Sequence, residues 1–317
     1  MRKRVLLVCL TVIAAACSNA PISSNAQPTA QAQQYVWTKV VDEGPWRKNY
    51  NFQMFVIDGK LMALHPDGTW MSKDGKAWEK SPLKNVINNQ AFLDYVFFKG
   101  SLYGLGYLEG NIERFTFKPE IYRTTDFKKW DTISKNSNLP RRFFYRPFVF
   151  KENIWIVGGE DRQTQFADVW NSPDGITWKK QVENAAFGKR SGSQVVELNG
   201  KLFLLNNDVW SSTDGINWQR ETSEIVKGEE IFGYTAVVFD QKIWLLGCNR
   251  NGRFSSQVLV SKDGKNWEGK NAPWTPRGGI AATVFNSALY MTGGKYGGTP
   301  DHVDFVYSND VWAMERQ

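Results

Sequence analysis

One tryptophan recurs along this chain at intervals of roughly 40 to 50 residues. The series consists of Trp37, Trp78, Trp130, Trp178, Trp218 and Trp267. A repeat of about 40 to 50 residues, built from short strands and turns, is typical of a β-propeller, in which each four-stranded unit buries its faces only against its neighbours. The repeat therefore constrains the fold far more than the function, because function depends on a site carried by the fold.

A tight turn of the pattern Ser-x-Asp-Gly-x-x-Trp precedes four of these tryptophans, starting at Ser72, Ser172, Ser212 and Ser261. Asp accepts backbone hydrogen bonds within such a turn, and Gly adopts positive φ without steric cost. A fifth copy has Phe127 in place of Gly, so that turn must be built differently or carry strain. We interpret the carboxylates of these motifs as turn residues rather than as an acid/base set; they are Asp74, Asp126, Asp174, Asp214 and Asp263.

A second series of turns separates pairs of apolar runs. These turns are Asp58-Gly59, Lys99-Gly100, Glu152-Asn153, Asn199-Gly200, Asp240-Gln241 and Asn286-Ser287. The two series together define six units of four strands, with no helical periodicity in the mature chain. We therefore predict an all-β fold, a six-bladed β-propeller of four-stranded blades.

The two ends of this region are complementary. The last unit begins near Arg277, reaches Asp310-Val311-Trp312, and lacks a fourth strand. The segment 35–39 resembles a fourth strand and precedes the first unit without a partner of its own. We predict that this N-terminal strand closes the last blade, which removes open sheet edges.

Two glycine pairs suggest a family resemblance. Gly158-Gly159 and Gly293-Gly294 each end a strand and are followed by an aromatic residue and then a tryptophan. This pattern resembles the kelch family of propellers, of the galactose-oxidase type, over residues 35–317. The turns are also similar to the Asp-box of bacterial sialidases, although they lack the residue between Asp and Gly. In both families the motif is structural, so the resemblance implies a fold and transfers no activity.

The N-terminus has the features of an export signal. Three basic residues, 2–4, precede an apolar run that ends before Cys17, which is typical of a secretory signal rather than a membrane span. The segment resembles a bacterial lipoprotein signal, which implies that Cys17 is lipidated; Ala14 departs from the usual Leu. The alternative is cleavage after an Ala-x-Ala site, which leaves a soluble periplasmic or secreted protein. We expect a lipid-anchored protein of the bacterial cell envelope, and the same resemblance implies, from Ser18 after the cysteine, the outer membrane if the cell is Gram-negative.

The remaining sequence divides simply. We interpret residues 1–17 as the signal, the polar residues 18–34 as a flexible tether, and residues 35–317 as one domain. Cys248 is then the one free thiol, so no disulfide framework is expected.

The chain carries a net charge of +7, and removing the three basic residues of the signal leaves +4. This mild charge without basic runs argues against nucleic-acid binding, and we expect a monomer whose partner is an envelope glycan or protein.

Motifs for metal or cofactor chemistry are missing. The chain contains two histidines, His65 and His302, which fall in different units. No His and Cys spacing suits zinc or copper. We therefore expect neither a metal nor a cofactor.

Arginines gather before the first strands of several units. Arg190 and Arg277 each lie nine residues before the first residue of the inner turn, and Arg142 lies close by in register. Because guanidinium groups suit carboxylates, we predict a ligand site at the mouth of the propeller, formed by Arg47, Arg146, Arg190, Arg250 and Arg277, with Trp46 and Trp274 as stacking surfaces for a sugar ring. The alternative is that Arg190 and Arg277 bridge neighbouring blades through backbone carbonyls.

Two classes of function remain. The first is a non-catalytic envelope lipoprotein whose mouth binds an acidic glycan, a peptide or a partner protein. The second is a carbohydrate-active enzyme, for which a sialic-acid epimerase or a sialidase is the nearest analogy, because kelch-like epimerases and Asp-box sialidases share this architecture. A sialidase would need three arginines on one carboxylate and a Tyr-Glu nucleophile pair, and the sequence places no such pair. We favour the binding protein.

Overall fold

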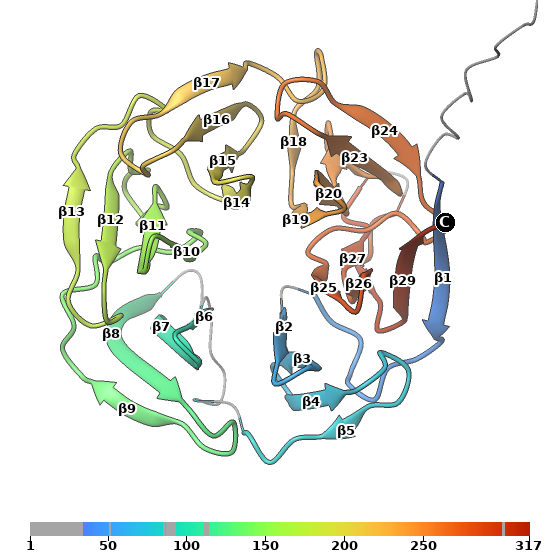
Figure 1. The fold of residues 1–317 in the computed structure, drawn as a ribbon, viewed down its shortest axis with the longest axis horizontal. Helices are drawn as coiled ribbons and strands as arrows, with labels where there is room; N and C mark the ends of the chain where they lie inside the picture. The colour runs from blue at the N-terminus through green and yellow to red at the C-terminus, as the bar shows by residue number, and fades with distance from the viewer. Residues whose placement is uncertain (1–33, 51, 85, 87–92, 111–113, 300–301) are drawn as a thin grey trace, which may run out of the picture. The chain divides into compact units, whose positions relative to one another are not determined.

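The computed structural model describes residues 34–50, 52–84, 86, 93–110, 114–299 and 302–317. The predicted signal, Cys17 and residues 18–33 of the predicted tether lie outside the described residues. From Tyr35 onward the described chain forms a ring of antiparallel sheets (Figure 1). This part of the chain contains no helix, and so none that could cross a membrane.

The described residues contain six four-stranded sheets, which we number as blades in chain order. Blade 1 consists of β2 (Gln53–Ile57), β3 (Lys60–His65), β4 (Gly68–Ser72) and β5 (Glu79–Lys80). Blade 2 consists of β6 (Asp94–Phe98), β7 (Ser101–Gly110), β8 (Phe115–Thr124) and β9 (Asp131–Ser134). Blade 3 consists of β10 (Phe148–Phe150), β11 (Asn153–Val157), β12 (Val169–Ser172) and β13 (Lys179–Val182).

The second half of the ring repeats this order. Blade 4 consists of β14 (Gln194–Leu198), β15 (Lys201–Leu205), β16 (Val209–Ser212) and β17 (Gln219–Thr222). Blade 5 consists of β19 (Thr235–Phe239), β20 (Lys242–Leu246), β23 (Gln257–Ser261) and β24 (Glu268–Asn271). Blade 6 consists of β25 (Ala281–Phe285), β26 (Ala288–Thr292), β29 (Val311–Arg316) and β1 (Tyr35–Val41). Short additional strands are β18 (Ile231–Phe232), β21 (Asn249–Arg250), β22 (Arg253–Phe254), β27 (Lys295–Tyr296) and β28 (Val306–Tyr307).

The predicted all-β propeller and its closure by the N-terminal strand are confirmed. Strand β1 pairs antiparallel with β29, so the first described strand is the outer strand of the last blade (Figure 1). The ring of Tyr35 packs edge-on against Trp244 of blade 5, with ring centroids 4.8 Å apart. The Tyr35 hydroxyl donates a hydrogen bond of 2.5 Å to Asp240, which also pairs with Arg316. The closing strand is therefore tied to a second blade as well as to its own.

The inner turns between first and second strands all use left-handed backbone. In blade 3 the two turn residues are Lys151 and Glu152, with φ of 44° and 60°. The predicted turn at Glu152-Asn153 is therefore wrong by one residue, because Asn153 already pairs with Phe150 in the sheet. Two successive residues of positive φ give the tight hairpin whose twist suits antiparallel strands.

Apolar clusters fill each junction between neighbouring blades, and a repeated contact organises them. An aromatic ring on the second strand of one blade packs against the turn glycine of the next blade. A Cβ atom at these glycines would lie 2.1 to 3.0 Å from the ring, in the pairs Tyr290 with Gly75, Tyr103 with Gly175, Trp155 with Gly215 and Phe203 with Gly264. The glycines thus provide both positive φ and room for the neighbouring ring. We call this the ring-against-turn contact.

The exception explains the fifth turn motif. In blade 1 the equivalent strand position holds Met62 instead of an aromatic residue, and the next turn holds Phe127 instead of glycine. Phe127 adopts a φ of 53°, so the predicted strain in this turn is present. Its ring packs in the same cluster as Met62. At this junction the aromatic ring therefore comes from the turn of blade 2 instead of from the second strand of blade 1.

Candidate functional site

The centre of the ring holds a cavity of about 830 Å³, which we call the central pocket. It opens at the end where the inner strands of the blades begin, and loops between second and third strands complete its wall. A pocket of this volume falls in the range of small-molecule sites. The fold therefore directs a set of side chains from several blades into one space.

Equivalent positions of the blades contribute to this wall. The residue five positions before the first residue of the inner turn is Gln53, Asp94, Arg146, Gln194, Thr235 or Ala281 in blades 1 to 6. The first five of these line the central pocket. Since only one acid and one base occur among them, Asp94 and Arg146 dominate the charge at this level of the pocket.

Asp94 and Arg146 come from neighbouring blades and are both partly exposed. Burial raises the pKa of Asp94 to about 7, and the nearby positive charge of Arg146 opposes that rise. Neither side chain makes a hydrogen bond or ion pair with any residue that the structure describes. The pocket thus contains an acid that titrates near neutral pH beside a guanidinium group available to a ligand.

Two exposed aromatic rings stand at the rim of the central pocket. Phe144 is 41% exposed and Phe232 is 50% exposed, and both line the pocket. Phe144 has a φ of 53°, a left-handed conformation that is costly for a bulky residue and that is often found at functional sites. Its carbonyl accepts a 2.7 Å hydrogen bond from the backbone N–H of Gly192, which holds the strained segment in place.

His65 and Arg47 border the pocket on the side of blade 1. The His65 ring is buried, and its Nδ1 accepts a 3.0 Å hydrogen bond from the backbone N–H of Asp67. Burial lowers the pKa of His65 to about 4, so the ring is neutral at pH 7. Arg47 forms an ion pair of 3.0 Å with the Asp67 carboxylate at the surface. Arg47 therefore lies where it was predicted, but its charge is already partnered.

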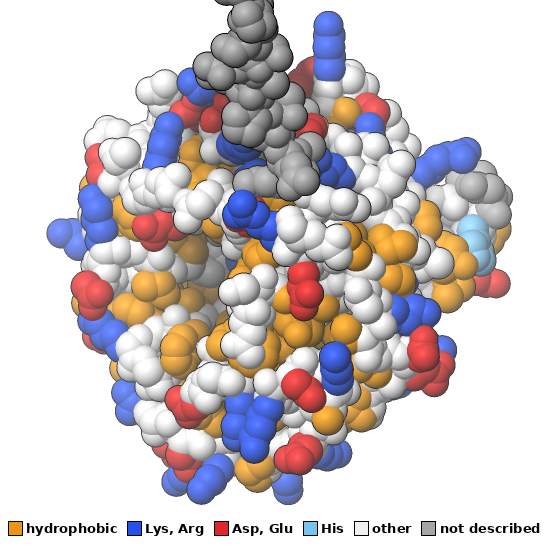
Figure 2. All heavy atoms as spheres, turned by 45° about the vertical axis from the view of Figure 1, so that its right-hand side comes forward, with side chains coloured by type: hydrophobic (Ala, Val, Ile, Leu, Met, Phe, Trp, Pro, Cys, Tyr) orange, Lys and Arg blue, Asp and Glu red, His pale blue; other side chains and the backbone are white. Residues whose placement is uncertain are grey.

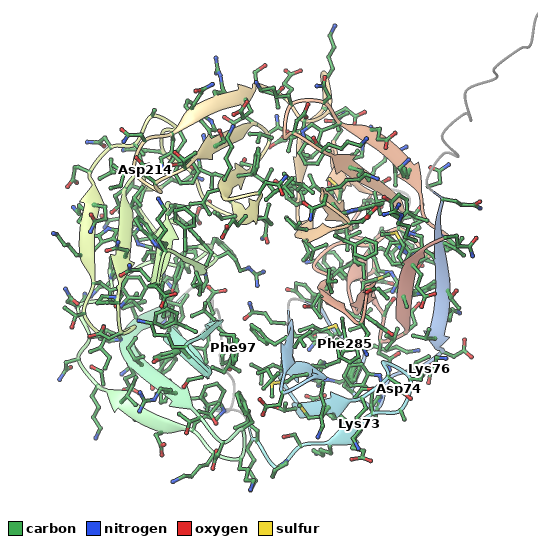
Figure 3. All side chains as sticks on the ribbon, in the orientation of Figure 1. Lys73, Asp74, Lys76, Phe97, Asp214 and Phe285 are labelled. Atoms are coloured by element: carbon green, nitrogen blue, oxygen red, sulfur yellow. The ribbon has the colours of Figure 1, made fainter. Side chains whose placement is uncertain are left out.

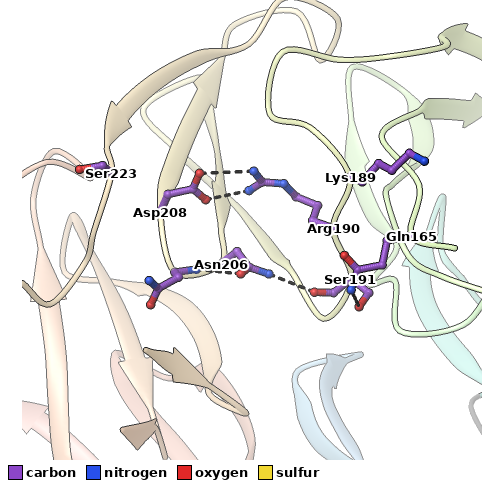
Figure 4. A pocket seen from close by; sticks show the side chains of 8 residues that line it. Gln165, Lys189, Arg190, Ser191, Asn206, Asp208 and Ser223 are labelled. Atoms are coloured by element: carbon purple, nitrogen blue, oxygen red, sulfur yellow. Dashed lines mark hydrogen bonds and ion pairs between the residues drawn. The ribbon is translucent and has the colours of Figure 1, made fainter. Parts of the chain in front are cut away.

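The structure gives Arg190 and Arg277 a different role from the predicted one. Each forms a two-pronged ion pair with the aspartate that precedes the third strand of its own blade, Asp208 or Asp310. Figure 4 shows the pair of Arg190 and Asp208. Each guanidinium group also donates to a backbone carbonyl, that of Phe187 for Arg190 and those of Thr275 and Gly293 for Arg277. These carbonyls lie in the same blade or in the segment that enters it, so the expected bridge to a neighbouring blade is not among these contacts.

A third copy of this arrangement lies in blade 3. Arg142 pairs with Asp168 at 2.6 and 2.9 Å, with both side chains buried. In all three copies the aspartate also accepts a hydrogen bond from the indole N–H of a tryptophan two residues later, at 2.6 to 2.8 Å. We call these sets the Arg–Asp–Trp triads; they are Arg142–Asp168–Trp170, Arg190–Asp208–Trp210 and Arg277–Asp310–Trp312. Their charges are satisfied within the protein, which points to a structural role.

The other predicted ligand residues are also accounted for. Arg250 is held by Glu229 through two hydrogen bonds of 2.6 Å and does not line the central pocket. Trp46 and Trp274 are each only 2% exposed and pack in the apolar clusters between blades. The prediction of two stacking tryptophans is therefore corrected, because neither offers a ring face to a ligand. Of the five predicted arginines, only Arg146 is without a hydrogen-bonded partner among the described residues.

The turn carboxylates lie away from the pocket, as expected of turn residues. Figure 3 shows Asp74 and Asp214 toward the outside of the ring. Asp74 accepts hydrogen bonds of 2.8 and 2.9 Å from the backbone N–H groups of Lys76 and Ala77. These hydrogen bonds hold the pKa of Asp74 below its ordinary value. The described residues contain no cluster of three or more His, Cys, Asp or Glu side chains suited to a metal ion.

Sequence reasoning missed Asp94, Phe144 and Phe232. The signal for Asp94 was hidden, because Asp94 shares the position of Arg146 only when the turn of blade 3 is placed at Lys151 and Glu152. The one-residue error in the turn of blade 3 also hid the role of Arg142. Counted from the corrected turn, Arg142 lies nine residues upstream, as Arg190 and Arg277 do. The exposure of the two rim rings depends on loop conformations that the sequence pattern does not determine.

Figure 2 shows acidic, basic and apolar side chains interspersed over one side of the molecule, with no large area of a single charge. This agrees with the mild net charge of the sequence. The central pocket differs, because Asp94 and Arg146 lie at one level of its wall, with the further charged residues Arg47, Asp67 and Glu230 also in its lining. The pocket is therefore the feature of the described surface that most resembles a ligand site.

Comparison with known proteins supports the fold. The model of the family described as "DUF6242 beta propeller domain" matches residues 124–313. The solved structure of YjhT aligns with 88% of this chain and 99% of its own length, with a TM-score of 0.68 and 11% sequence identity. At this identity the likeness shows a shared propeller fold only. No curated protein matches the chain. The chain belongs to the family of DUF6242 β-propeller domains.

Proposed function

We propose that this protein is an exported, lipid-anchored β-propeller of the bacterial cell envelope that binds an acidic saccharide in its central pocket. The observation that carries this proposal is Arg146, whose guanidinium group lines the pocket without a hydrogen-bonded partner among the described residues. A partly buried cation of this kind favours an anion that can accept its forked hydrogen bonds. A sugar carboxylate has this geometry.

The rim rings support a saccharide rather than a simple anion. Phe144 and Phe232 are exposed aromatic residues that line the pocket, and an apolar face of a sugar ring can pack on an aromatic ring. Gln53 and Gln194 line the wall at the level of Arg146 and offer amide groups for hydroxyl groups. The pocket therefore combines a cation, aromatic surfaces and neutral hydrogen-bonding groups.

Binding calorimetry with a panel of acidic and neutral saccharides tests this proposal. The acidic members should bind to the wild-type protein, and Arg146→Ala should weaken that binding by about 10-fold or more, the effect of losing one charge-assisted hydrogen-bonded contact. Arg250→Ala is the matched control, because it removes an equally positive residue outside the pocket. Equal affinities of the wild-type protein and Arg146→Ala would refute the site.

A second candidate, a carbohydrate-active enzyme, is favoured by Asp94. Its pKa of about 7 suits a general acid or base that works near neutral pH. This candidate predicts turnover of a bound acidic saccharide that Asp94→Asn abolishes while binding persists. If nuclear magnetic resonance shows that the saccharide binds stably and that no product forms, the binding protein is favoured.

A further inference from the structure

A second cavity of about 310 Å³ opens beside the central pocket, and we call it the side groove. It shares four lining residues with the central pocket: Gln165, Ser191, Asn206 and Asn207. Gln165 comes from the β11–β12 loop of blade 3, and the asparagines come from the β15–β16 loop of blade 4. The two cavities therefore meet along one polar wall, and a single ligand can extend from one into the other.

The side groove is polar; the charges of Arg190 and Asp208 offset each other, and Lys189 adds one positive charge at its edge. Arg190 and Asp208 line it as the ion pair described above (Figure 4). Asn206 donates to the carbonyl of Ser191 at 3.0 Å, which stiffens the shared wall. Lys189 is exposed at the edge, where its ammonium group makes a long contact of 3.4 Å with the Thr164 hydroxyl. A neutral, hydroxyl-bearing group suits such a surface better than a second anion deep in the groove.

Several hydrogen-bonding atoms of this wall remain available. Gln165 uses its Nε2 to donate to the Ser191 hydroxyl at 3.1 Å, and its Oε1 has no partner among the described residues. Asn207 uses its Oδ1 to accept from the backbone N–H of Ile231 at 3.0 Å, and its Nδ2 is likewise unpaired in the described part of the chain. Ser223 is exposed and lines the groove on the side opposite Gln165 and Lys189 (Figure 4). One free acceptor, one free donor and a hydroxyl group can satisfy the hydroxyl groups of a sugar ring.

We propose that the side groove binds a neutral sugar unit adjacent to an acidic unit that occupies the central pocket, so that the natural ligand is an oligosaccharide with an acidic terminal residue. This inference rests on the proposed function, because it extends the ligand from Arg146 into the groove. A peptide is disfavoured because the described residues that line the groove include no apolar side chain to accept an apolar residue.

Calorimetry with two matched pairs of probes tests the inference. One pair is N-acetylneuraminic acid and sialyllactose; the other is glucuronic acid and its disaccharide with N-acetylglucosamine. In at least one pair the oligosaccharide should bind about 10-fold more tightly than its acidic monosaccharide. Ser223→Trp, which fills the far side of the groove, should abolish this difference and leave the monosaccharide affinity unchanged.

A second variant guards against an indirect effect of the tryptophan. Gln165→Ala should reduce the extra affinity for the oligosaccharide by about 2- to 5-fold. Gln163→Ala should not reduce it, because Gln163 is an exposed residue of the same loop outside both cavities. If the monosaccharides bind but the oligosaccharides bind no more tightly, or if Ser223→Trp leaves the difference in affinity intact, the groove inference is overturned and the central site stands. If no probe binds, or if Arg146→Ala binds all of them as the wild type does, the proposed function itself fails.

Discussion

Asp208 accepts hydrogen bonds from both terminal nitrogens of Arg190, at 2.8 and 3.3 Å, and a third from the indole of Trp210 at 2.6 Å. The aspartate precedes the third strand of blade 4, and the arginine precedes the first strand. The interaction therefore links the start of the first strand to the start of the third strand, on the side of the blade at the mouth of the propeller. Its recurrence in blades 3 and 6 makes it part of the repeat, and in blade 4 the same ion pair also lines the side groove.

Removing one partner of a triad should destabilise the fold. Asp168→Ala leaves the buried Arg142 without its counter-charge, and we expect a loss of about 3 to 5 kcal/mol in the free energy of unfolding, measured by urea denaturation. Arg47→Ala breaks an exposed pair and should cost no more than about 1 kcal/mol. Equal small losses in both variants would show that the triads contribute little to stability.

The affinity for an acidic saccharide should depend on pH through Asp94. Below pH 7 the carboxyl group is protonated and Arg146 faces the ligand alone; as the pH rises through about 7, the carboxylate forms and repels the anion. We expect binding to weaken by up to about 10-fold between pH 6 and pH 8, since at most one proton is exchanged per ligand bound. In Asp94→Asn this pH dependence should disappear from the calorimetric titrations, whereas the matched Asp67→Asn should retain it.

The same residue should affect stability without any ligand. The pKa of Asp94 is higher in the folded protein than in the unfolded chain, so the folded state holds the proton more tightly. This contribution is therefore full at low pH and is lost as the pH rises from about 4 to about 7. Asp94→Asn should accordingly gain stability relative to the wild type at pH 8 and not at pH 4, as measured by thermal unfolding. A gain of equal size at both pH values would contradict the raised pKa.

Closure of the ring makes the first described strand essential. Removing residues 35–40 exposes the edge of β29 and takes away the contacts of Tyr35 with Trp244 and Asp240. We expect loss of the cooperative thermal transition of the full domain. A truncation of residues 18–33, which we expect to be a tether, should melt as the wild type does.

The proposed anchor has a direct test. Cys17→Ser should move the protein from the membrane fraction to the soluble fraction, because acyl chains supply most of the attachment energy of a lipoprotein. Cys248→Ser is the control, since that thiol is buried in the propeller. Unchanged membrane association of Cys17→Ser would favour the alternative of signal cleavage without lipidation.

The architecture was predictable from local chemistry, whereas the site was only partly so. Turns such as that of Asp74 depend on residues within a few positions of each other, so their pattern in the sequence reports the blades directly. The burial of Trp46 and Trp274 depends on packing between blades, which the prolines immediately before them, Pro45 and Pro273, do not reveal. The pKa of Asp94 depends on enclosure by several blades, which no single segment encodes.

The ring-against-turn contacts also restrict how such a chain can change by recombination between its repeats. Blades 3 and 4 each present a ring to the next blade and accept one at a turn glycine, so an exchanged copy of either would find a compatible neighbour on both sides. The second blade differs, because Phe127 fills the space that its neighbour leaves open at Met62. A duplicated second blade placed after any unit other than the first would set Phe127 against a tyrosine, phenylalanine or tryptophan of that unit. The first two blades are therefore expected to be inherited together.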